Sequence, residues 1–322
     1  MRERRVLVTG AGGFIGRWSV PPLVRAGFDV HVVVSGGMNG QIPAELTGSK
    51  PHFADLLKEP DIDALLDRVR PTHLLHFAWI AAPGIYWTSA DNARWLAASQ
   101  YLLRSFHARG GSRVMMAGTC AEYDWSRAGV CDEQTTPLAD ASAAAAAPYA
   151  VCKIAMQRAL AEFGLRKQLS TAWGRIFFQF GPYEHPNRLV PSVIRHLLLE
   201  QEAPCSHGRQ VRSFLHVSDV GAAFAKVLDS DVEGTLNIGS DEPISIAELI
   251  ECIGRQIGRP ELLRLGERPT PPREPPLLVP DIRRLRDEVR WRPRFTLHDG
   301  LSHAIDWWRG QLAEEARAGN HR

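Results

Sequence analysis

Apolar runs rich in β-branched residues alternate with longer amphipathic stretches along the first half of the chain. The short runs predict strands, and the stretches between them have helical spacing. The predicted strands cover residues 5–9, 29–34, 73–78, 113–117 and 171–178, and the predicted helices cover 90–108 and 149–163. Strands that alternate with helices are typical of a parallel sheet covered by helices. We therefore expect an α/β fold with a doubly wound parallel sheet.

The pattern changes after Gly181 and Pro182, where the apolar runs become shorter and prolines more frequent. Further strands are predicted at 215–217 and 235–238, helices at 246–257 and 301–308, and an extended segment at 269–280. We expect a larger domain at residues 1–180, to which part of 212–240 returns. Residues 181–322 would form a smaller α/β domain, with the active site in the cleft between the two.

Two adjacent prolines, Pro21 and Pro22, lie where the first helix is expected. Proline lacks an amide hydrogen and clashes with the preceding turn, which costs about 3 kcal/mol inside a helix. We therefore expect a kink or an early end of the helix at these residues.

Composition excludes several classes of protein. The 322 residues are 44% hydrophobic and 23% charged, and the net charge of +2 gives no basic field for a nucleic acid. No apolar stretch approaches the roughly 18 residues of a membrane span, and a strand begins too close to Met1 to leave room for a signal peptide. The five cysteines are scattered without CxxC spacing, which argues against disulfides and a zinc site. We expect a cytoplasmic protein that binds no metal, nucleic acid or membrane.

Gly10, Gly13 and Gly16 stand three residues apart, directly after the first predicted strand and before a helical pattern. The pyrophosphate of a dinucleotide needs a tight turn, close approach of the backbone, and a helix N-terminus with free N–H groups. The position of these glycines predicts a dinucleotide cofactor. No GxxxxGK[ST] motif occurs, so a P-loop ATPase or kinase is not supported.

The end of the second predicted strand bears on the choice between NAD and NADP. NAD-binding proteins usually place a carboxylate there for the ribose 2′-hydroxyl, but residues 33–37 contain none. Ser35 supplies a hydroxyl instead, and Arg17 supplies a positive charge just after the last glycine of the turn. These residues would tolerate a 2′-phosphate, so we expect NADP to be preferred over NAD.

Tyr149 and Lys153 are four residues apart and so lie on one face of a predicted helix. A nearby ammonium would lower the pKa of the phenol and allow it to exchange a proton with an alcohol or carbonyl. Thr119 follows a predicted strand and would place a hydroxyl at the edge where the cofactor of an open α/β sheet lies. We expect these three residues to form the catalytic site.

Together, these motifs resemble those of the extended short-chain dehydrogenase/reductase family, in its nucleotide-sugar epimerase, dehydratase and reductase branch. The resemblance runs from Thr9 to about Trp308. It rests on the TGxxGxxG turn at 9–16, Asp55-Leu56, His76-Phe77-Ala78-Trp79, Thr119 four residues before Tyr123, Tyr149 with Lys153, RIFFQFGP at 175–182, RSFLHVSDV at 212–220, Asn237-Ile238-Gly239, Trp291-Arg292-Pro293 and Gly300-Leu301.

The resemblance implies a Rossmann-type domain and a set of roles. Tyr149 would donate or accept the proton, Lys153 would hold the nicotinamide ribose, and Thr119 would bind the substrate oxygen. The residues implied to contact the cofactor are Gly10, Gly13, Phe14, Ile15, Gly16, Arg17, Ser35, Asp55, Leu56, Ala78, Tyr149 and Lys153.

On the substrate side, the resemblance implies contacts from Trp79, Thr119, Phe178, Arg212 and Arg273. The two arginines stand where the branch binds the substrate diphosphate, a task that suits a guanidinium group. Phe178 departs from the family pattern, because many relatives carry asparagine there. Tyr86, Trp87 and Trp125 lie in segments that border the substrate in relatives.

The leading expectation is an NAD(P)-dependent oxidoreductase that reduces the keto group of a nucleotide-activated 4-keto-6-deoxy sugar. A nucleotide-sugar 4-epimerase with tightly bound NAD is the nearest alternative. A non-catalytic dinucleotide-sensing protein and a reductase for a more hydrophobic carbonyl also remain open. Relatives pair the helices near 90–108 and 149–163 across a homodimer, and apolar residues such as Trp95, Leu102 and Met156 there favour the same assembly.

Elimination of water is not expected. Dehydratases of the branch carry an Asp-Glu pair directly after the catalytic threonine, where this chain has Cys120 and Ala121. Alanine carries no proton, and a thiol with a pKa of about 8.5 is a poor substitute for a carboxylic acid. Glu122 is one place further on, in what is expected to be a strand, so its side chain would point away from that of Ala121.

Overall fold

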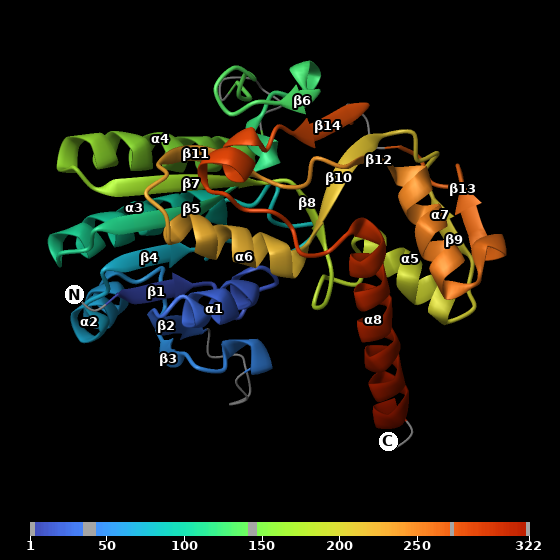
Figure 1. Cartoon of the computed structure of the whole chain (residues 1–322), viewed down its shortest axis with the longest axis horizontal. Coiled ribbons are helices and arrows are strands. Elements are labelled where there is room, and N and C mark those ends of the chain that lie inside the picture. The colour runs from blue at the N-terminus through green and yellow to red at the C-terminus, as the bar shows by residue number, and fades with distance from the viewer. Residues whose placement is uncertain (1–3, 35–42, 141–146, 271–273, 320–322) are drawn as a thin grey trace.

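The larger part of the computed structural model is a parallel sheet of seven strands in the order β11-β7-β5-β4-β1-β2-β3 (Figure 1). The structure describes residues 4–34, 43–140, 147–270 and 274–319. The strands are β1 (Arg5–Thr9), β2 (Asp29–Val34), β3 (Lys50–Phe53), β4 (His73–His76), β5 (Arg113–Thr119), β7 (Ser170–Ile176) and β11 (Gly234–Ile238). This confirms the predicted α/β fold with a doubly wound parallel sheet.

Helices cover both faces of this sheet. One face packs against α1 (Gly16–Arg25) and α6 (Val217–Leu228), and the other against α2 (Glu59–Val69), α3 (Asp91–Ala108) and α4 (Pro148–Lys167). Alternate strand residues supply the two cores: Val6 and Val8 point to one face, and Leu7 points to the other. All three side chains are fully buried, as expected where helices cover a parallel sheet on both sides.

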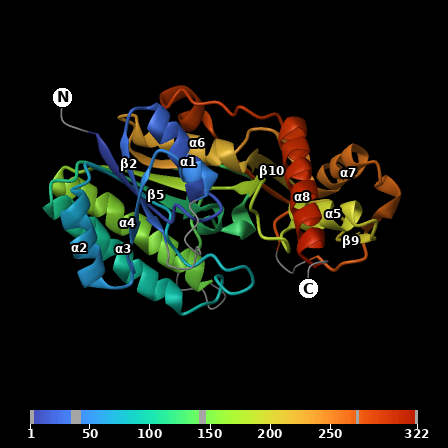
Figure 2. The same cartoon turned by 90° about the horizontal axis from the view of Figure 1, so that it is seen from below.

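A second group of elements lies beyond the carboxyl ends of the large sheet. Its strands are β6 (Val130–Cys131), β8 (Phe178–Phe180), β10 (Val211–His216), β12 (Pro243–Ser245) and β14 (Leu277–Pro280), with β9 (Ala203–Cys205) and β13 (Leu263–Leu265) as a separate pair. Its helices are α5 (Leu189–Leu198), α7 (Ile246–Ile257) and α8 (Leu297–Gly319). In both overall views, α8 lies between the large sheet with its helices and α7 (Figure 2).

Short helical turns complete the described part of the chain. They are η1 (Ala44–Leu46), η2 (Cys120–Glu122), η3 (Trp125–Arg127), η4 (Pro260–Leu262) and the π-helical turn η5 (Arg284–Glu288). No helix among the described residues is long and apolar enough to span a membrane.

Of the two outcomes expected at the prolines, a kink or an early end of the helix, the early end is wrong, because α1 continues past both prolines to Arg25. Pro22 cannot donate to the carbonyl of Trp18, and Gly221 of α6 lies against that carbonyl instead. A Cβ atom at Gly221 would lie 2.6 Å from the oxygen. Val20 is fully buried between this helix and the sheet. Packing against α6 therefore holds the turn that the prolines weaken.

Several elements were not predicted. β3 is an edge strand with largely exposed side chains, so it lacks an apolar alternation. α6 is buried on nearly every side, so its sequence lacks the alternation of apolar and polar positions by which a surface helix is recognised. The strand predicted at 171–178 is two strands, because β7 ends at Ile176 and β8 begins at Phe178 in the other sheet.

The apolar residues that favoured a homodimer lie inside the chain. Leu102 and Leu103 of α3 and Met156 of α4 are buried against the large sheet, and Ile154 is also buried. Trp95 and Leu96 pack partly against the same core. These side chains therefore form no apolar face for a partner, and the homodimer stays a prediction that rests on the resemblance.

Candidate active site

The glycine turn joins β1 to α1 at the carboxyl edge of the large sheet. Gly10 has a φ of +69°, and a Cβ atom there would lie 2.8 Å from the amide nitrogen of Ala78, at the end of β4. A Cβ atom at Gly16 would lie 2.2 Å from the carbonyl oxygen of Gly10. Both positions thus need glycine. No side chain caps the N-terminus of α1, so its N–H groups remain for an anion.

These features fit the pyrophosphate of a dinucleotide. Gly13 is exposed at the crest of the turn, and Phe14 and Ile15 are half-buried beside it. The backbone of Gly10–Gly16 would hold the phosphates, and the missing side chains leave room for their close approach.

Arg17 is engaged by the turn and by the second group of elements. Its guanidinium donates to the carbonyls of Gly13 (3.1 Å) and Gly12 (2.7 Å). It also lies 3.9 Å from the centre of the Tyr183 ring and 3.9 Å from a carboxylate oxygen of Glu45. Arg17 is therefore not free to meet a 2′-phosphate in this arrangement. Ser35, the other residue behind the NADP expectation, lies outside the described residues.

The two remaining residues implied for the adenine end differ in exposure. Asp55 is exposed just after β3, where its carboxylate accepts from the amide of Leu57 at 3.0 Å. Leu56 is buried in the core beneath α2. Asp55 is thus open to a ligand, whereas Leu56 presents little beyond its backbone.

The structure brings Thr119 and Tyr149 together. Thr119 is the last residue of β5 and Tyr149 lies in the first turn of α4, where the Thr119 hydroxyl is close enough to the phenol to favour its ionised form and so to act on the pKa of Tyr149. The Thr119 hydroxyl also accepts from the amide of Ala121 at 3.2 Å. Two hydroxyl groups therefore converge at the carboxyl edge of β5, where a carbonyl oxygen can be bound between them.

Lys153 lies one turn along α4, but its ammonium does not point at the phenol oxygen. Its Nζ donates to the carbonyl of Ala117 at 2.8 Å and lies 4.0 Å from the centre of the Trp79 ring. Burial lowers the pKa of Lys153 to about 7 and raises the pKa of Tyr149 above its ordinary value. The expectation that Lys153 lowers the pKa of Tyr149 is therefore wrong for this arrangement, because desolvation dominates.

Aromatic rings surround the Tyr149 side chain. The ring centre of Tyr86 is 4.8 Å away and that of Trp87 is 6.0 Å away, and Trp87 in turn lies 5.6 Å from Trp125. Trp79 donates from its indole nitrogen to Asn92 at 2.8 Å and covers Lys153. The surroundings of the phenol are apolar, which is consistent with the raised pKa of Tyr149.

Arg212 does not lie open to a diphosphate, contrary to expectation. Its side chain is 2% exposed and pairs with the carboxylate of Glu274 at 3.0 Å. It also donates to the carbonyls of Val211 and Pro275, and its guanidinium carbon lies 5.3 Å from the centre of the Phe178 ring. The carboxylate and carbonyls satisfy both terminal nitrogens. Arg273 lies outside the described residues.

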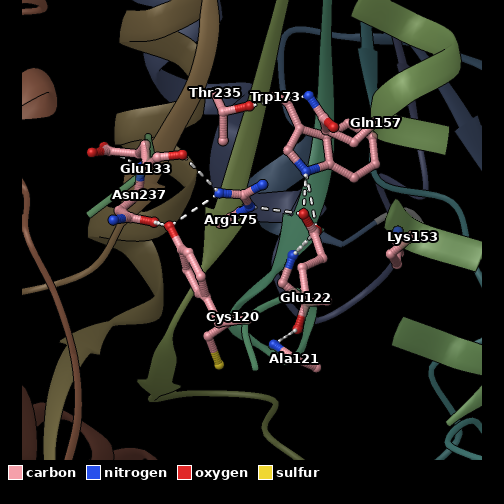
Figure 3. A network of polar contacts seen from close by, with 12 residues as sticks. Cys120, Ala121, Glu122, Glu133, Lys153, Gln157, Trp173, Arg175, Thr235 and Asn237 are labelled. Carbon is pink, nitrogen blue, oxygen red and sulfur yellow. Dashed lines mark hydrogen bonds and ion pairs between the residues drawn. The ribbon is translucent and has the colours of Figure 1, made fainter. Parts of the chain in front are cut away.

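Sequence reasoning missed the role of Glu122 and its partners. The chain leaves β5 at Thr119 and enters the η2 turn, so the expectation that Glu122 lies in a strand is wrong. Glu122 is fully buried and ion-paired to Arg175 of β7 at 2.8 Å (Figure 3). A signal was present, because threonine followed three residues later by glutamate is a capping box.

Among the described residues, no group of three or more His, Cys, Asp or Glu side chains could hold a metal ion. The hydroxyl, ammonium and backbone groups described above lie on β5, α4 and the glycine turn.

Comparisons with known proteins agree with this geometry. The model of the NAD dependent epimerase/dehydratase family matches residues 6–239. The dTDP-glucose 4,6-dehydratase of Xanthomonas campestris is 27% identical, with coverage of 94% of this chain and 92% of the relative. The UDP-glucose 4-epimerase of Azospirillum brasilense is also 27% identical, with coverage of 98% and 95%.

Solved structures share the fold. The UDP-glucose 4-epimerase of Thermus thermophilus in complex with NAD superimposes with a TM-score of 0.78 at 24% identity, over 95% of this chain and 99% of that one. The family match covers most of the chain and contains the glycine turn, Thr119, Tyr149 and Lys153. The chain therefore belongs to the NAD-dependent epimerase/dehydratase family and is an enzyme of the extended short-chain dehydrogenase/reductase type.

Proposed function

We propose that this enzyme interconverts a keto group and an alcohol on a nucleotide-activated sugar. The observation that carries the proposal is the contact between Thr119 and Tyr149 at the carboxyl edge of β5, the edge that also holds the glycine turn. Ligands of open α/β sheets bind at this edge. The nucleotide sugars named for the relatives supply the substrate class.

The residues divide the work of the reduction. Thr119 donates a hydrogen bond to the keto oxygen and fixes its position. Tyr149 gives its phenolic proton to that oxygen as the C–H bond forms, and the raised pKa of Tyr149 keeps the proton in place until then. NADH, when bound, would supply the hydride. In the reverse direction the phenolate form of Tyr149 would accept the proton of the alcohol.

Lys153 would hold the ribose of the nicotinamide. Its pKa of about 7 leaves a large fraction of the side chain charged at neutral pH. In the described arrangement its ammonium donates one hydrogen bond to the Ala117 carbonyl, and the other two N–H donors would serve the ribose hydroxyls.

The coenzyme is NAD, as in the structural neighbours that contain it. One observation still favours NADP, namely the lack of a carboxylate at 33–37. The other no longer does, because Arg17 donates its hydrogen bonds to the carbonyls of Gly12 and Gly13. Fluorescence titration with NADH and NADPH decides between the two. If Ser35 contacts the ribose, Ser35→Asp shifts the preference toward NADH by repelling a 2′-phosphate.

Elimination of water, the reaction named for one relative, is not proposed. Burial raises the pKa of Cys120 to about 12, and Ala121 carries no proton. Glu122 is held by Arg175, Trp173 and the amide of Thr119. The positions that would supply the acid and base of a dehydratase therefore offer neither.

Reduction of a 4-keto-6-deoxy sugar and 4-epimerisation remain two forms of the proposal, and the relatives support epimerases equally. A non-catalytic sensor is disfavoured because Thr119, Tyr149 and Lys153 are all present. The test incubates the purified protein with NAD, NADH and a panel of nucleotide hexoses and 4-keto-6-deoxy sugars, and follows products by mass and chromatography.

Three outcomes are informative. Consumption of NADH with a gain of two hydrogens identifies a reductase. A product of unchanged mass with retained NAD identifies an epimerase. A product that has lost one water contradicts the proposal.

A further inference from the structure

The carboxylate of Glu122 is fully buried and contacts the backbone of Thr119. Its Oε1 accepts from the amide of Thr119 at 2.8 Å and from the indole of Trp173 at 3.0 Å. Its Oε2 accepts from Nε of Arg175 at 2.8 Å. A charge without solvent contact is costly unless it is paired and hydrogen-bonded. The amide of Thr119, the indole of Trp173 and the guanidinium of Arg175 together stabilise the buried carboxylate.

The backbone at the end of β5 fits closely against this carboxylate. A Cβ atom at Gly118 would lie 2.5 Å from Oε1 of Glu122 and 2.1 Å from the indole nitrogen of Trp173. Glycine thus allows the strand to approach the buried pair. The position of Thr119 is set by the carboxylate rather than by its own side chain alone.

The network extends from Glu122 across the sheet. Arg175 donates to the hydroxyl of Tyr123 at 3.1 Å, and that hydroxyl donates to Asn237 of β11 at 2.7 Å (Figure 3). The end of β5 is therefore fixed to β7 and β11 through side chains that solvent barely reaches.

We propose that Glu122 is a positioning residue that holds Thr119 in contact with Tyr149 and provides the buried negative charge that Lys153 faces. The inference rests on the proposed function, in which these three residues act on the substrate. It assigns a task to a residue that the family resemblance left without one.

Geometry and electrostatics around Lys153 support the second part. Its Nζ lies 5.9 Å from the centre of the Trp173 ring, whose indole nitrogen donates to Glu122 at 3.0 Å. Glu122 is the nearby group that favours the ammonium, against the burial that disfavours it. His76 of β4 faces Lys153 as well, but burial keeps its pKa at about 3, so it stays neutral. Tyr149 on the same helix is also neutral. Arg175 partly offsets the carboxylate, and it lies on the opposite side of Glu122 from Lys153 in the view of Figure 3.

The substitution Glu122→Gln separates charge from geometry, because the amide oxygen can still accept from Thr119. The chain has five lysines, so protein labelled with [13C]lysine gives few signals, and loss of one signal in Lys153→Met assigns it. We expect the titration midpoint of Lys153 to fall by at least about one pH unit in Glu122→Gln. No substrate or coenzyme is needed, so the result is independent of whether the proposed reaction is correct.

Glu133→Gln is the matched control. Glu133 accepts from the Asn237 amide at 2.8 Å and from Arg175 through its backbone, on the other side of the same network. The Glu133→Gln substitution should leave the titration midpoint of Lys153 unchanged. If Glu122→Gln does not fold, Glu122→Gln with Arg175→Met removes both charges, which is better tolerated than one unpaired charge.

Hydrogen exchange at the Thr119 amide tests the first part. Protection should fall at least about tenfold in Glu122→Ala and persist in Glu122→Gln. An unchanged Lys153 midpoint in Glu122→Gln and in the double variant, or full protection of the Thr119 amide in Glu122→Ala, would overturn the proposal.

Discussion

The glycine turn and the surroundings of Arg212 would bind a charged ligand in different ways. In the turn, the backbone is the binding surface, and Gly10 and Gly16 are required because no side chain fits. In the second group of elements, the expected ligand residue Arg212 is buried against Glu274. A backbone site is prepared before the ligand arrives, whereas a side chain in an ion pair must first lose its partner.

This difference suggests where specificity among relatives resides. The turn offers N–H groups that suit any dinucleotide pyrophosphate. Phe178 stands where the family resemblance implies asparagine, and its ring lies 5.3 Å from the guanidinium carbon of Arg212. We therefore expect side chains such as these, rather than the backbone of the turn, to decide the choice of substrate.

The largest effect is expected at Tyr149, the candidate proton donor, which belongs neither to the glycine turn nor to the surroundings of Arg212. Tyr149→Phe removes only the phenolic hydroxyl, so turnover should fall about 100- to 10,000-fold, as for loss of a general acid. Coenzyme affinity, measured by fluorescence, should stay within about twofold. Retained turnover would remove Tyr149 from the mechanism.

Gly16→Ala tests the backbone site. The added methyl would lie 2.2 Å from the carbonyl oxygen of Gly10, so the turn must shift, at a cost of about 3 kcal/mol. We expect NADH affinity to fall about 100-fold in fluorescence titration. Gly129→Ala is the control, because nothing lies within 4 Å of its added methyl. Equal affinities for the two variants would contradict the steric account.

Glu274→Ala tests the side-chain site. It leaves the Arg212 guanidinium buried without its carboxylate, so unfolding by urea should show a loss of about 2 kcal/mol. Glu202→Ala breaks the exposed pair with Arg264 and should cost less than about 1 kcal/mol. If Arg212 binds the diphosphate, UDP affinity measured by calorimetry rises in Glu274→Ala. An unchanged affinity removes Arg212 from the substrate site.

The stability of the folded protein should also depend on pH, because of the buried carboxyl group of Glu184. Burial raises the pKa of Glu184, in the loop after β8, to about 8. Between pH 4.5 and 8 the folded protein keeps a proton that the unfolded chain has lost, so stability falls as pH rises through this range. Glu184→Gln should therefore raise the melting temperature by a few degrees at pH 8.5 and by less at pH 5. Exposed Glu314→Gln should show no such dependence.

The smallest effect is expected from Arg17→Ala. Since Arg17 donates to the carbonyls of Gly12 and Gly13, its loss should change the ratio of NADPH to NADH affinity by less than about threefold. A selective loss of NADPH binding would restore Arg17 as the partner of a 2′-phosphate.

The elements that were predicted correctly are those that depend on residues close together in the sequence. The strand before Gly10, the glycine spacing, and the four-residue spacing of Tyr149 and Lys153 are all local. Thr119 was placed at the sheet edge because the apolar run before it ends there. Local patterns determine backbone geometry, and the parallel sheet then brings these segments together.

The features that were missed depend on partners far along the chain. Arg212 meets a carboxylate 62 residues away, and Glu122 meets an arginine 53 residues away. Nothing near Arg212 indicates that its charge is already neutralised. The pKa of Tyr149 was predicted from its neighbour Lys153, but burial by Tyr86 and Trp87 could not be seen from spacing.

The contact between Arg17 and Tyr183 has a consequence for the dwell time of the coenzyme. Tyr183 donates to Glu45 at 2.9 Å and packs 4.9 Å from Trp307 of α8, while Arg17 holds the carbonyls of the glycine turn. The two halves of the molecule cannot separate here without pulling Arg17 away from the ring or the turn. Movement of the two halves apart would therefore disturb the glycine turn, and we expect the rate of coenzyme release to depend on that movement.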